Sequence, residues 1–236
     1  MQPVSFPTFL TVLSGVCWTL VYIDGIRLGF KQHTYAMPFW ALALNIAWEF
    51  LHAALGYQHA GLALQTVING VWALFDVGIL YTYLRYGRKW FPKDLPAGAF
   101  ILWTLLGLTT AAVVQYGFVV ELGLVAGRAY AAFLQNLLMS VLFIGMFAQR
   151  AGSEGQSLTI AVNKWVGTLA PTILFGVVGA KGFDGPNRFI LAIGLLCSVF
   201  DLIYIALLVR AKARERRGEP SRRAERGELG SVSVAD

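Results

Sequence analysis

Seven long apolar stretches occupy most of the sequence, and they constrain the fold more than any other feature. A helix that crosses a bilayer needs about 20 predominantly apolar residues. Hydrophobic residues make up 57% of the chain and charged residues only 14%, whereas soluble domains have roughly 45–50% apolar residues. We therefore predict an all-α, polytopic membrane protein, a seven-transmembrane-helix bundle. The predicted spans are residues 6–23, 37–54, 63–84, 97–120, 130–148, 158–180 and 189–209.

The lysine and arginine residues predict the orientation of this bundle. With seven crossings, only Arg128, Lys181 and Arg188, of 19 Lys and Arg residues in the chain, fall on the side of the N-terminus. Cytoplasmic loops are enriched in these residues, so we expect the N-terminus outside and the C-terminus in the cytoplasm. Residues 1–209 then form the membrane domain, and residues 210–236 a basic cytoplasmic tail, predicted to be disordered because it lacks an apolar face. No motif indicates a nucleic-acid partner.

Three of the predicted helices carry polar residues along one face. A charged side chain at the bilayer centre costs at least about 2.5–3.5 kcal/mol on insertion scales, so such residues need an explanation. Residues spaced three, four and seven apart share one face of a helix. The resulting stripes are Asn45, Glu49 and His52; Gln65, Asn69, Trp72 and Asp76; and Cys197, Asp201, Tyr204 and Leu208. We expect the stripes to converge on the bundle interior and to line a polar cavity.

Some of these polar residues also have a purely structural explanation. Asn and Gln side chains commonly form hydrogen bonds between transmembrane helices, and this role suffices for Asn45, Asn69 and Gln115. Asp76 fits a structural role and a functional role equally well. The sequence leaves both interpretations open for these residues.

Several other residues indicate no metal or redox chemistry. His52 follows Glu49 by three residues, but a single E-x-x-H motif does not build a metal site, and we expect a hydrogen-bonded histidine. Cys17 and Cys197 lack any metal or disulfide spacing and are predicted to be small buried hydrophobic residues. Lys164, near the start of the sixth predicted helix, is expected to extend to the membrane interface.

Glu49 and Asp201 lie near the middle of their predicted helices, and this position favours a functional role. Desolvation favours the neutral form of a carboxyl group, which is then a proton donor that needs no metal. A second carboxyl group can orient the first or accept a proton later. The indole rings of Trp48 and Trp72, beside the polar stripes, can stabilise a carbocation through their faces. These groups suit a polyene cyclisation that is started by a proton, and they suit a proton relay in a transporter.

The segments NIAWEF around Glu49 and SVFDLIY around Asp201 resemble the small integral-membrane terpene cyclases of meroterpenoid and indole-terpenoid biosynthesis. The resemblance extends from the first span through Val209. It implies that Glu49 and Asp201 form the acid pair that starts cyclisation. Our hypothesis takes Glu49 as the donor and Asp201 as its partner, although the sequence leaves open which of the two carboxyl groups gives the proton. It also implies a cavity shaped by Trp48, Trp72 and Tyr204, with Asn45, His52, Asn69 and Asp76 as further substrate-binding residues.

The same resemblance implies a substrate and an environment. The substrate is a prenylated aromatic or indole compound, expected to carry a farnesyl chain, and the acid acts on its terminal alkene or epoxide. Fungal members typically open an epoxide, whereas drimentine-type bacterial relatives protonate an alkene. The long Arg- and Glu-rich tail favours a bacterial member, and thus a bacterial plasma membrane.

Motifs for other chemistries are missing from the sequence. It has no D-D-x-x-D cluster to hold Mg²⁺ against a prenyl diphosphate, and no D-x-D-D motif of the soluble protonating cyclases. We therefore expect an acid mechanism without metal or cofactor. A proton-coupled small-molecule transporter is the alternative, because the same carboxyl groups would serve it. A purely structural membrane subunit is a further alternative.

Overall fold

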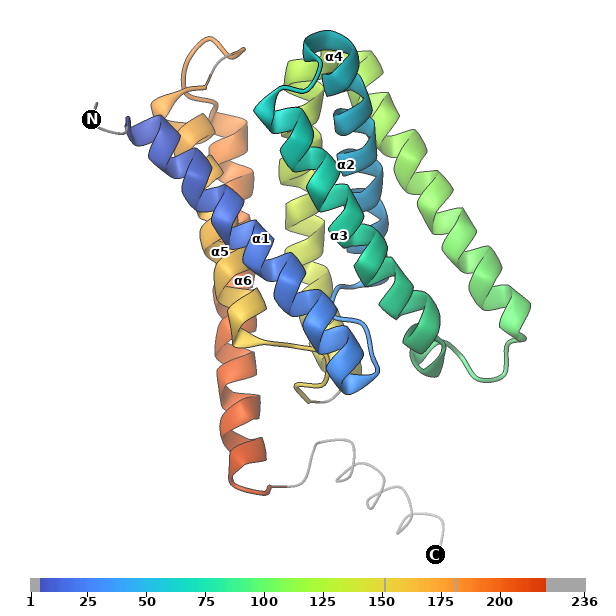
Figure 1. Cartoon of the computed structure of the whole chain (residues 1–236). Coiled ribbons are helices and arrows are strands. Elements are labelled where there is room, and N and C mark those ends of the chain that lie inside the picture. Colours follow the sequence, from blue (N-terminus) through green and yellow to red (C-terminus); the bar gives the residue numbers. More distant parts are fainter. Residues whose placement is uncertain (1–4, 151, 181, 220–236) are drawn as a thin grey trace, which may run out of the picture.

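A computed structural model describes residues 5–150, 152–180 and 182–219, and their regular secondary structure is entirely helical (Figure 1). Six long helices account for most of it. A one-turn 3₁₀-helix follows α3, and a short π-helix, η2, continues α5. The bounds are α1 Phe6–Gln32, α2 Phe39–Ala60, α3 Leu64–Tyr86, η1 Gly87–Trp90, α4 Ala97–Arg150, α5 Leu158–Ile173, η2 Leu174–Val178 and α6 Arg188–Arg216.

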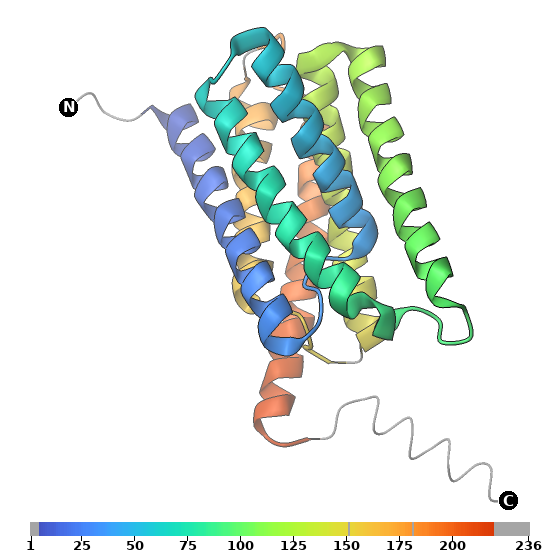
Figure 2. The same cartoon turned by 45° about the vertical axis from the view of Figure 1, so that its right-hand side comes forward.

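The helix α4 reverses its direction at Gly123. Its 54 residues would reach about 80 Å in one straight helix, far beyond the ~30 Å of a hydrocarbon core. Gly123 has φ 74° and ψ 169°, a backbone conformation that glycine adopts without steric penalty. At Gly127 an added Cβ would lie 2.4 Å from the Phe118 carbonyl oxygen. The first limb (residues 97–122) and second limb (residues 124–150) therefore run antiparallel, as Figure 2 shows.

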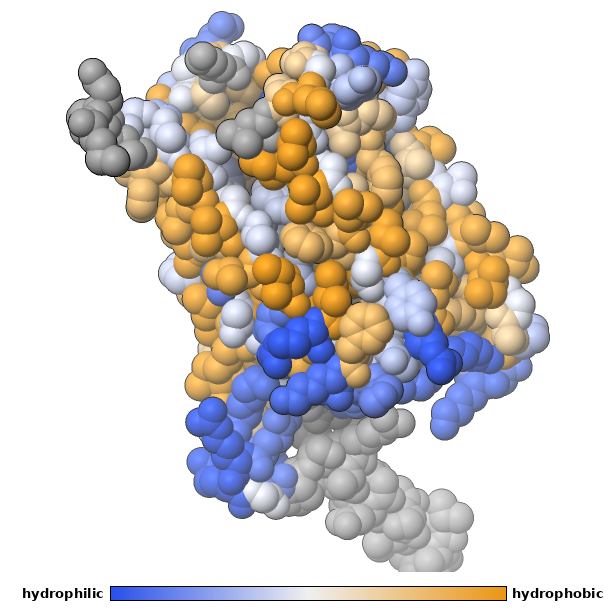
Figure 3. All heavy atoms as spheres, in the orientation of Figure 1, coloured by the Kyte–Doolittle hydropathy of each residue, from blue (hydrophilic) through white to orange (hydrophobic). Residues whose placement is uncertain are grey.

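The outside of the bundle is strongly apolar. Side chains such as Leu74 and Leu102 are each 69% exposed, as expected where lipid replaces water around the helices. Figure 3 shows hydrophobic residues over the flanks of this face and hydrophilic residues at the end from which α6 projects. Six helices in the described part of the chain are long and apolar enough to span a membrane. The count of seven spans stays a prediction, because it requires each limb of α4 to cross separately.

The inside of the bundle combines aromatic packing with many buried polar groups. Tyr22, Phe143 and Tyr204 are among its largest fully buried side chains. α1 packs against α3 and α5, α2 packs between α3 and α4, and α6 packs against α4 and α5. Cys17 and Cys197 are free and buried, as predicted. This packing holds α1, α2, α3, the second limb and α5 around one space.

Two helices are longer than their apolar segments. α1 continues beyond Ile23 to Gln32, and α6 continues beyond Val209 to Arg216. The residues after Val209 are mainly Ala, Lys, Arg and Glu, which favour helix in water as well as in lipid. The first part of the predicted tail is therefore helical, and residues 220–236 lie outside the described residues.

Candidate active site

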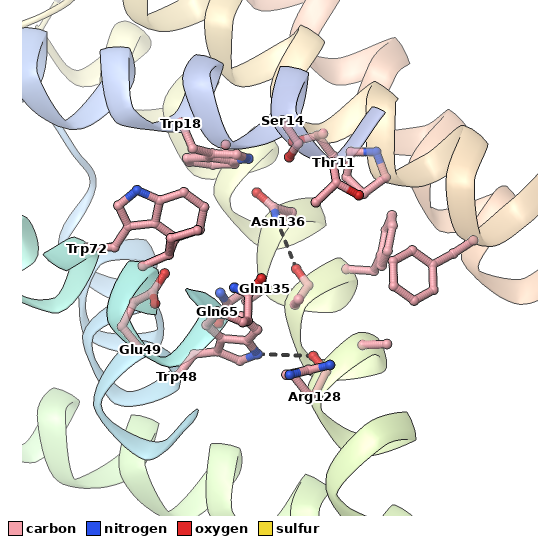
Figure 4. A pocket seen from close by; sticks show the side chains of 18 of the residues that line it. Thr11, Ser14, Trp18, Trp48, Glu49, Gln65, Trp72, Arg128, Gln135 and Asn136 are labelled. Carbon is pink, nitrogen blue, oxygen red and sulfur yellow. Dashed lines mark hydrogen bonds between the residues drawn. The ribbon is translucent and has the colours of Figure 1, made fainter. Parts of the chain in front are cut away.

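A cavity of about 310 Å³ lies between α1, α2, α3, the second limb of α4 and the end of α5 (Figure 4). Its volume is at the lower end of the roughly 300–1,000 Å³ typical of small-molecule sites. Most of the lining is apolar, with Leu10, Ile68 and Phe133 among its residues, and a few polar side chains project between them. This composition is typical of a site that encloses a hydrophobic ligand and orients it at a few points.

One wall of the cavity is shaped by an irregular helix end. Pro171 lies inside α5 and cannot donate the backbone hydrogen bond of a regular helix. The chain then continues as the π-helix η2, a rare conformation that is frequent at functional sites. Pro171, Leu174 and Phe175 all line the cavity. The departure from α-helical geometry thus falls where the wall faces the cavity.

Among the described residues, Glu49 is the one acidic side chain that lines the cavity. It comes from α2 and is only 2% exposed. The Tyr22 hydroxyl donates a hydrogen bond to its carboxyl group. The second oxygen, Oε2, has no hydrogen-bond partner among the described residues. Glu49 therefore presents a buried carboxyl group at the cavity wall, with Tyr22 as its donor and with Oε2 unpaired among the described residues.

A chain of amide side chains leads from α4 to Glu49. Gln115 Nε2 donates to Gln135 Oε1 at 2.6 Å, and Gln135 Nε2 donates to Asn45 Oδ1 at 3.1 Å. Asn45 Nδ2 donates to the Tyr22 hydroxyl at 2.5 Å, and Tyr22 in turn donates to Glu49. Each amide therefore has a fixed orientation, with its donor facing the carboxyl end of the chain. We call Gln115, Gln135, Asn45 and Tyr22 the donor chain.

A second carboxyl group, that of Asp76, closes this network from α3. Asn45 Nδ2 donates to Asp76 Oδ2 at 3.0 Å, and Asp76 is close enough to Glu49 to interact with it electrostatically. Asp76 is completely buried and does not line the cavity. Asp76 is thus an acidic neighbour of Glu49 that lies behind the cavity wall.

Indole rings form much of the remaining wall around Glu49. Trp18 and Trp72 lie near Tyr22, with ring centroids 6.3 Å and 6.1 Å from its ring. Trp72 Nε1 donates to Thr19 Oγ1 at 3.2 Å, and Trp48 Nε1 donates to the Arg128 carbonyl oxygen at 3.0 Å. Figure 4 shows all three indole rings around the space beside Glu49. Because these two N–H groups are already bonded, the ring faces are what Trp48 and Trp72 offer to a ligand.

The structure brings together some of the predicted site residues and separates others. Asn45, Trp48, Glu49 and Trp72 line the cavity. His52, Asn69, Asp76, Asp201 and Tyr204 do not appear in its lining.

The residues outside the lining have other surroundings. His52 is buried against Trp48 at a ring distance of 4.7 Å, and neither ring nitrogen has a hydrogen-bond partner among the described residues, contrary to our expectation. Asn69 accepts a hydrogen bond from Gln65 at 2.8 Å. Tyr204 donates to Gln156 at 3.0 Å. These three residues lie behind the cavity wall or away from it.

Asp201 forms an ion pair with Lys164 rather than with Glu49. Lys164 Nζ lies 2.7 Å from Asp201 Oδ1 and 2.7 Å from Ser140 Oγ. The two side chains are 0% and 1% exposed. The prediction that Lys164 extends to the interface is therefore wrong. Lys164 shares its face of α5 with Ile160, Ala161 and Gly167, which are buried, so this face turns inward and the ammonium group needs a buried partner.

Tyr22 and Arg128 are among the cavity residues that the sequence did not indicate. Tyr22 lies in an apolar span with no polar stripe to mark it. Arg128 was counted as part of a loop between two spans, but the tight reversal at Gly123 places it on the second limb. There it stands four residues before Ala132 and seven before Gln135, which also line the cavity. This helical spacing was a signal in the sequence that depended on knowing where the loop ends.

The described residues contain no group of three or more His, Cys, Asp or Glu side chains arranged to hold a metal ion. The polar groups of the cavity are instead one carboxyl group, several amides and hydroxyls, and one guanidinium group. Their arrangement can supply a proton and can accept or donate hydrogen bonds.

Comparisons with known proteins give the chain a family. The model of a family described as Pyr4-like transmembrane terpene cyclases matches residues 2–214. The Pyr4-family terpene cyclase mfmH of Annulohypoxylon moriforme is 31% identical over 70% of this chain and 68% of its own length. The terpene cyclase pyr4 of Aspergillus fumigatus is 23% identical over 87% and 86%, and the terpene cyclase adrI of Penicillium rubens 26% over 94% and 92%. No solved structure matches the chain.

Proposed function

Because this chain belongs to the Pyr4-like transmembrane terpene cyclases, we propose that the cavity is its active site and that Glu49 supplies the starting proton. Membership of this family makes the chain a terpene cyclase embedded in a membrane, rather than a transporter or a structural subunit. The observation that carries the proposal is the position of Glu49, an acidic side chain that lines the cavity with one oxygen free of partners.

The proposed substrate is a prenylated aromatic or indole compound with a farnesyl chain. Glu49 transfers its proton to the terminal alkene carbon or to the oxygen of a terminal epoxide. The remaining double bonds of the chain then close rings in turn, and the last cation loses a proton. Glu49 regains a proton at the end, so the product is an isomer of the substrate and no co-reactant is consumed.

The groups around Glu49 favour both its protonated state before the reaction and its deprotonated state after proton transfer. Two neighbouring carboxyl groups in an apolar site cost less free energy when one of them carries a proton. Asp76 is the second carboxyl group here. When Glu49 has given up its proton, the hydrogen bond from Tyr22 stabilises the resulting carboxylate. The indole faces of Trp48 and Trp72 stabilise the carbocation as it moves along the chain.

Asp201 has a different role in this proposal from the one its sequence motif implies. It lies outside the cavity lining and is held by Lys164. We assign it to positioning, because its ion pair joins α6 to α5, and α5 carries Thr168 and Pro171 of the cavity wall. In this proposal Asp201 influences the active site by holding α5 and α6 together, and it does not act on Glu49 by direct contact.

The proposed topology has seven crossings, with each limb of α4 counted once, and the N-terminus outside. The cavity is lined by α1 from Leu10 to Tyr22, by the middle of α2 and by the first half of α3. It therefore extends from the middle of the bundle toward the end nearest the N-terminus, which is the outer end in this topology. The relatives named above are fungal, and the bacterial origin stays a prediction.

Incubation in deuterated water tests the mechanism. Purified protein is offered a farnesylated aromatic compound and its terminal epoxide, and products are analysed by mass spectrometry. We expect a cyclic isomer. Cyclisation from the alkene adds one non-exchangeable deuterium at carbon, whereas opening of the epoxide leaves deuterium only on an exchangeable hydroxyl group. Conversion must stop in Glu49→Gln and continue in the control Glu121→Gln, whose side chain is exposed. Full turnover by Glu49→Gln would refute the proposal.

A further inference from the structure

We propose that Arg128 binds an acidic oxygen group on the head of the substrate, at the opposite end of the cavity from Glu49. Such a group is a carboxyl group, or a phenol or enol hydroxyl beside a carbonyl. This inference rests on the proposed function and deepens it, because it selects oxygenated aromatic head groups over a plain indole. It assigns the two ends of the cavity to the two ends of one amphiphilic substrate.

Arg128 is a cationic side chain of the cavity without a partner in the described part of the chain. It lines the cavity and is half-buried. No described residue forms an ion pair or hydrogen bond with its guanidinium group, and only its backbone carbonyl is used, by Trp48. By contrast, Lys164 is fully paired with Asp201 and Ser140. The half-buried guanidinium group thus has no protein anion beside it, and an anionic group of a ligand in the cavity can be its partner.

The position of Arg128 places this ligand group far from the acid. On the second limb Arg128 precedes Gln135 by seven residues, about 10 Å along a helix, and Gln135 belongs to the donor chain that leads to Glu49. In Figure 4 the ring of Trp48 lies between Glu49 and Arg128. A head group at Arg128 therefore extends its prenyl chain toward Glu49.

Most of the other polar groups of the cavity that are not in the donor chain already have hydrogen-bond partners. Thr11 Oγ1 donates to the Pro7 carbonyl at 2.9 Å, and Ser14 Oγ donates to the Gly167 carbonyl at 2.7 Å. Asn136 Nδ2 donates to the Ala132 carbonyl at 3.1 Å, while its Oδ1 is buried without a partner. The Thr168 hydroxyl, which also lines the cavity, is likewise buried without a partner among the described residues. The unpaired groups are thus one guanidinium, one amide oxygen and one hydroxyl, and of these three only the guanidinium carries a positive charge.

These free groups determine the chemistry of the head. A guanidinium group has five donors and no acceptor, and it binds two neighbouring oxygens in a bidentate manner. An indole N–H is a donor, so an indole head satisfies Asn136 Oδ1 but leaves Arg128 unpaired. An acidic hydroxyl beside a carbonyl, or a carboxylate, provides the acceptors that Arg128 lacks. The cavity therefore favours a prenylated compound with an acidic oxygen.

Equilibrium binding to purified protein tests this without any turnover. The probes are a farnesylated phenolic acid and its methyl ester methyl ether, which differ only in the acidic oxygens. The change in fluorescence of the cavity tryptophans reports binding. We expect the acid to bind about 10-fold or more tightly than the methylated form, the size of a hydrogen bond to a charged group. Equal binding of the two ligands to the unaltered protein would overturn the inference.

Variants locate the preference at Arg128. Arg128→Gln should bind both ligands alike, Arg128→Lys should keep part of the preference, and Arg85→Gln, at an exposed arginine, should keep it all. Melting temperature and elution volume verify that each variant is folded. An undiminished preference in folded Arg128→Gln would mean that another group binds the acid, and it would overturn the inference. In turnover, Arg128→Gln should raise KM for the acid and leave kcat nearly unchanged.

The Arg128 site and the proposed function of Glu49 can succeed or fail independently in these experiments. Glu49→Gln should retain the binding preference while it loses cyclisation. If Glu49→Gln still turns over, the proposed function fails even though the Arg128 site stands. If the acid preference is missing in both the unaltered protein and Glu49→Gln, the Arg128 site fails even though cyclisation stands.

Discussion

Two of the buried carboxyl groups in the bundle, those of Glu49 and Asp201, have opposite surroundings. Glu49 is bonded by a neutral hydroxyl group, has a free oxygen and lines a cavity. Asp201 is bonded by a buried ammonium group and lies outside the cavity lining. The comparison teaches that burial of an acidic residue in a membrane does not by itself indicate catalysis. The partner of the carboxyl group distinguishes the two cases. A neutral hydroxyl partner is compatible with a carboxyl group that keeps its proton and can donate it, whereas a cationic partner such as Lys164 pairs with a carboxylate.

Replacing Glu49 by Gln should have the largest effect on activity. The amide keeps the shape and the contact with Tyr22 but has no acidic proton. General acids contribute typically 100-fold to 10,000-fold to a rate, and we expect turnover to fall by about that factor. The melting temperature of Glu49→Gln should stay close to that of the unaltered protein. A folded variant with more than about a tenth of normal turnover would contradict the role of Glu49 as the proton donor.

Asp201→Asn should instead act on stability. It leaves the buried ammonium group of Lys164 without its carboxylate, and breaking a buried ion pair costs about 3–5 kcal/mol. Thermal unfolding in detergent measures this loss, and turnover should fall with the folded fraction. The double variant Lys164→Met with Asp201→Leu should recover much of the stability, because apolar replacement of a buried pair is often neutral. If this double variant is folded but inactive, Asp201 has a chemical role after all.

Asp76→Asn should have an intermediate effect on activity. Its amide can turn an N–H₂ group toward Asn45, which removes the acceptor that orients the donor chain. Hydrogen bonds to charged groups contribute about 1.5–3 kcal/mol, so turnover should fall by roughly 10-fold to 100-fold with KM little changed. Steady-state kinetics on the folded variant measure both constants. A normal kcat would mean that Asp76 stabilises the bundle without positioning Glu49.

Gln115→Leu should have the smallest effect. Gln115 is the far end of the donor chain, and its loss removes the bonds to Gln135 and to the Leu44 carbonyl. A neutral hydrogen bond contributes about 1 kcal/mol, so we expect a small loss of stability and a turnover within about 3-fold of normal. A loss as large as that of Asp76→Asn would show that the orientation of the whole chain controls Glu49.

The sequence predicted the helices well and the pairing of side chains poorly. Hydrophobicity identified the helices, and helical spacing put Asn45 and Glu49 on one face of α2 and Trp72 on one face of α3. These three residues and the neighbouring Trp48 line the cavity. Spacing along a single helix does not say which helices are neighbours. The stripe with Asp201 therefore does face inward, but it meets Lys164 of α5. Arg128 was missed for a similar reason, since the loop length between the limbs of α4 was unknown.

The reversal of α4 at Gly123 has a consequence for the biogenesis of the protein. In the proposed topology both limbs enter the membrane with their connection facing outward, so the connection must be translocated across the lipid. A turn built around one glycine carries few unpaired backbone groups into the hydrocarbon. Its limbs also form contacts between residues near in sequence, such as Gln115 and Gln135, which favours rapid pairing. The hairpin can therefore enter the bilayer as one unit, with the first link of the donor chain already formed.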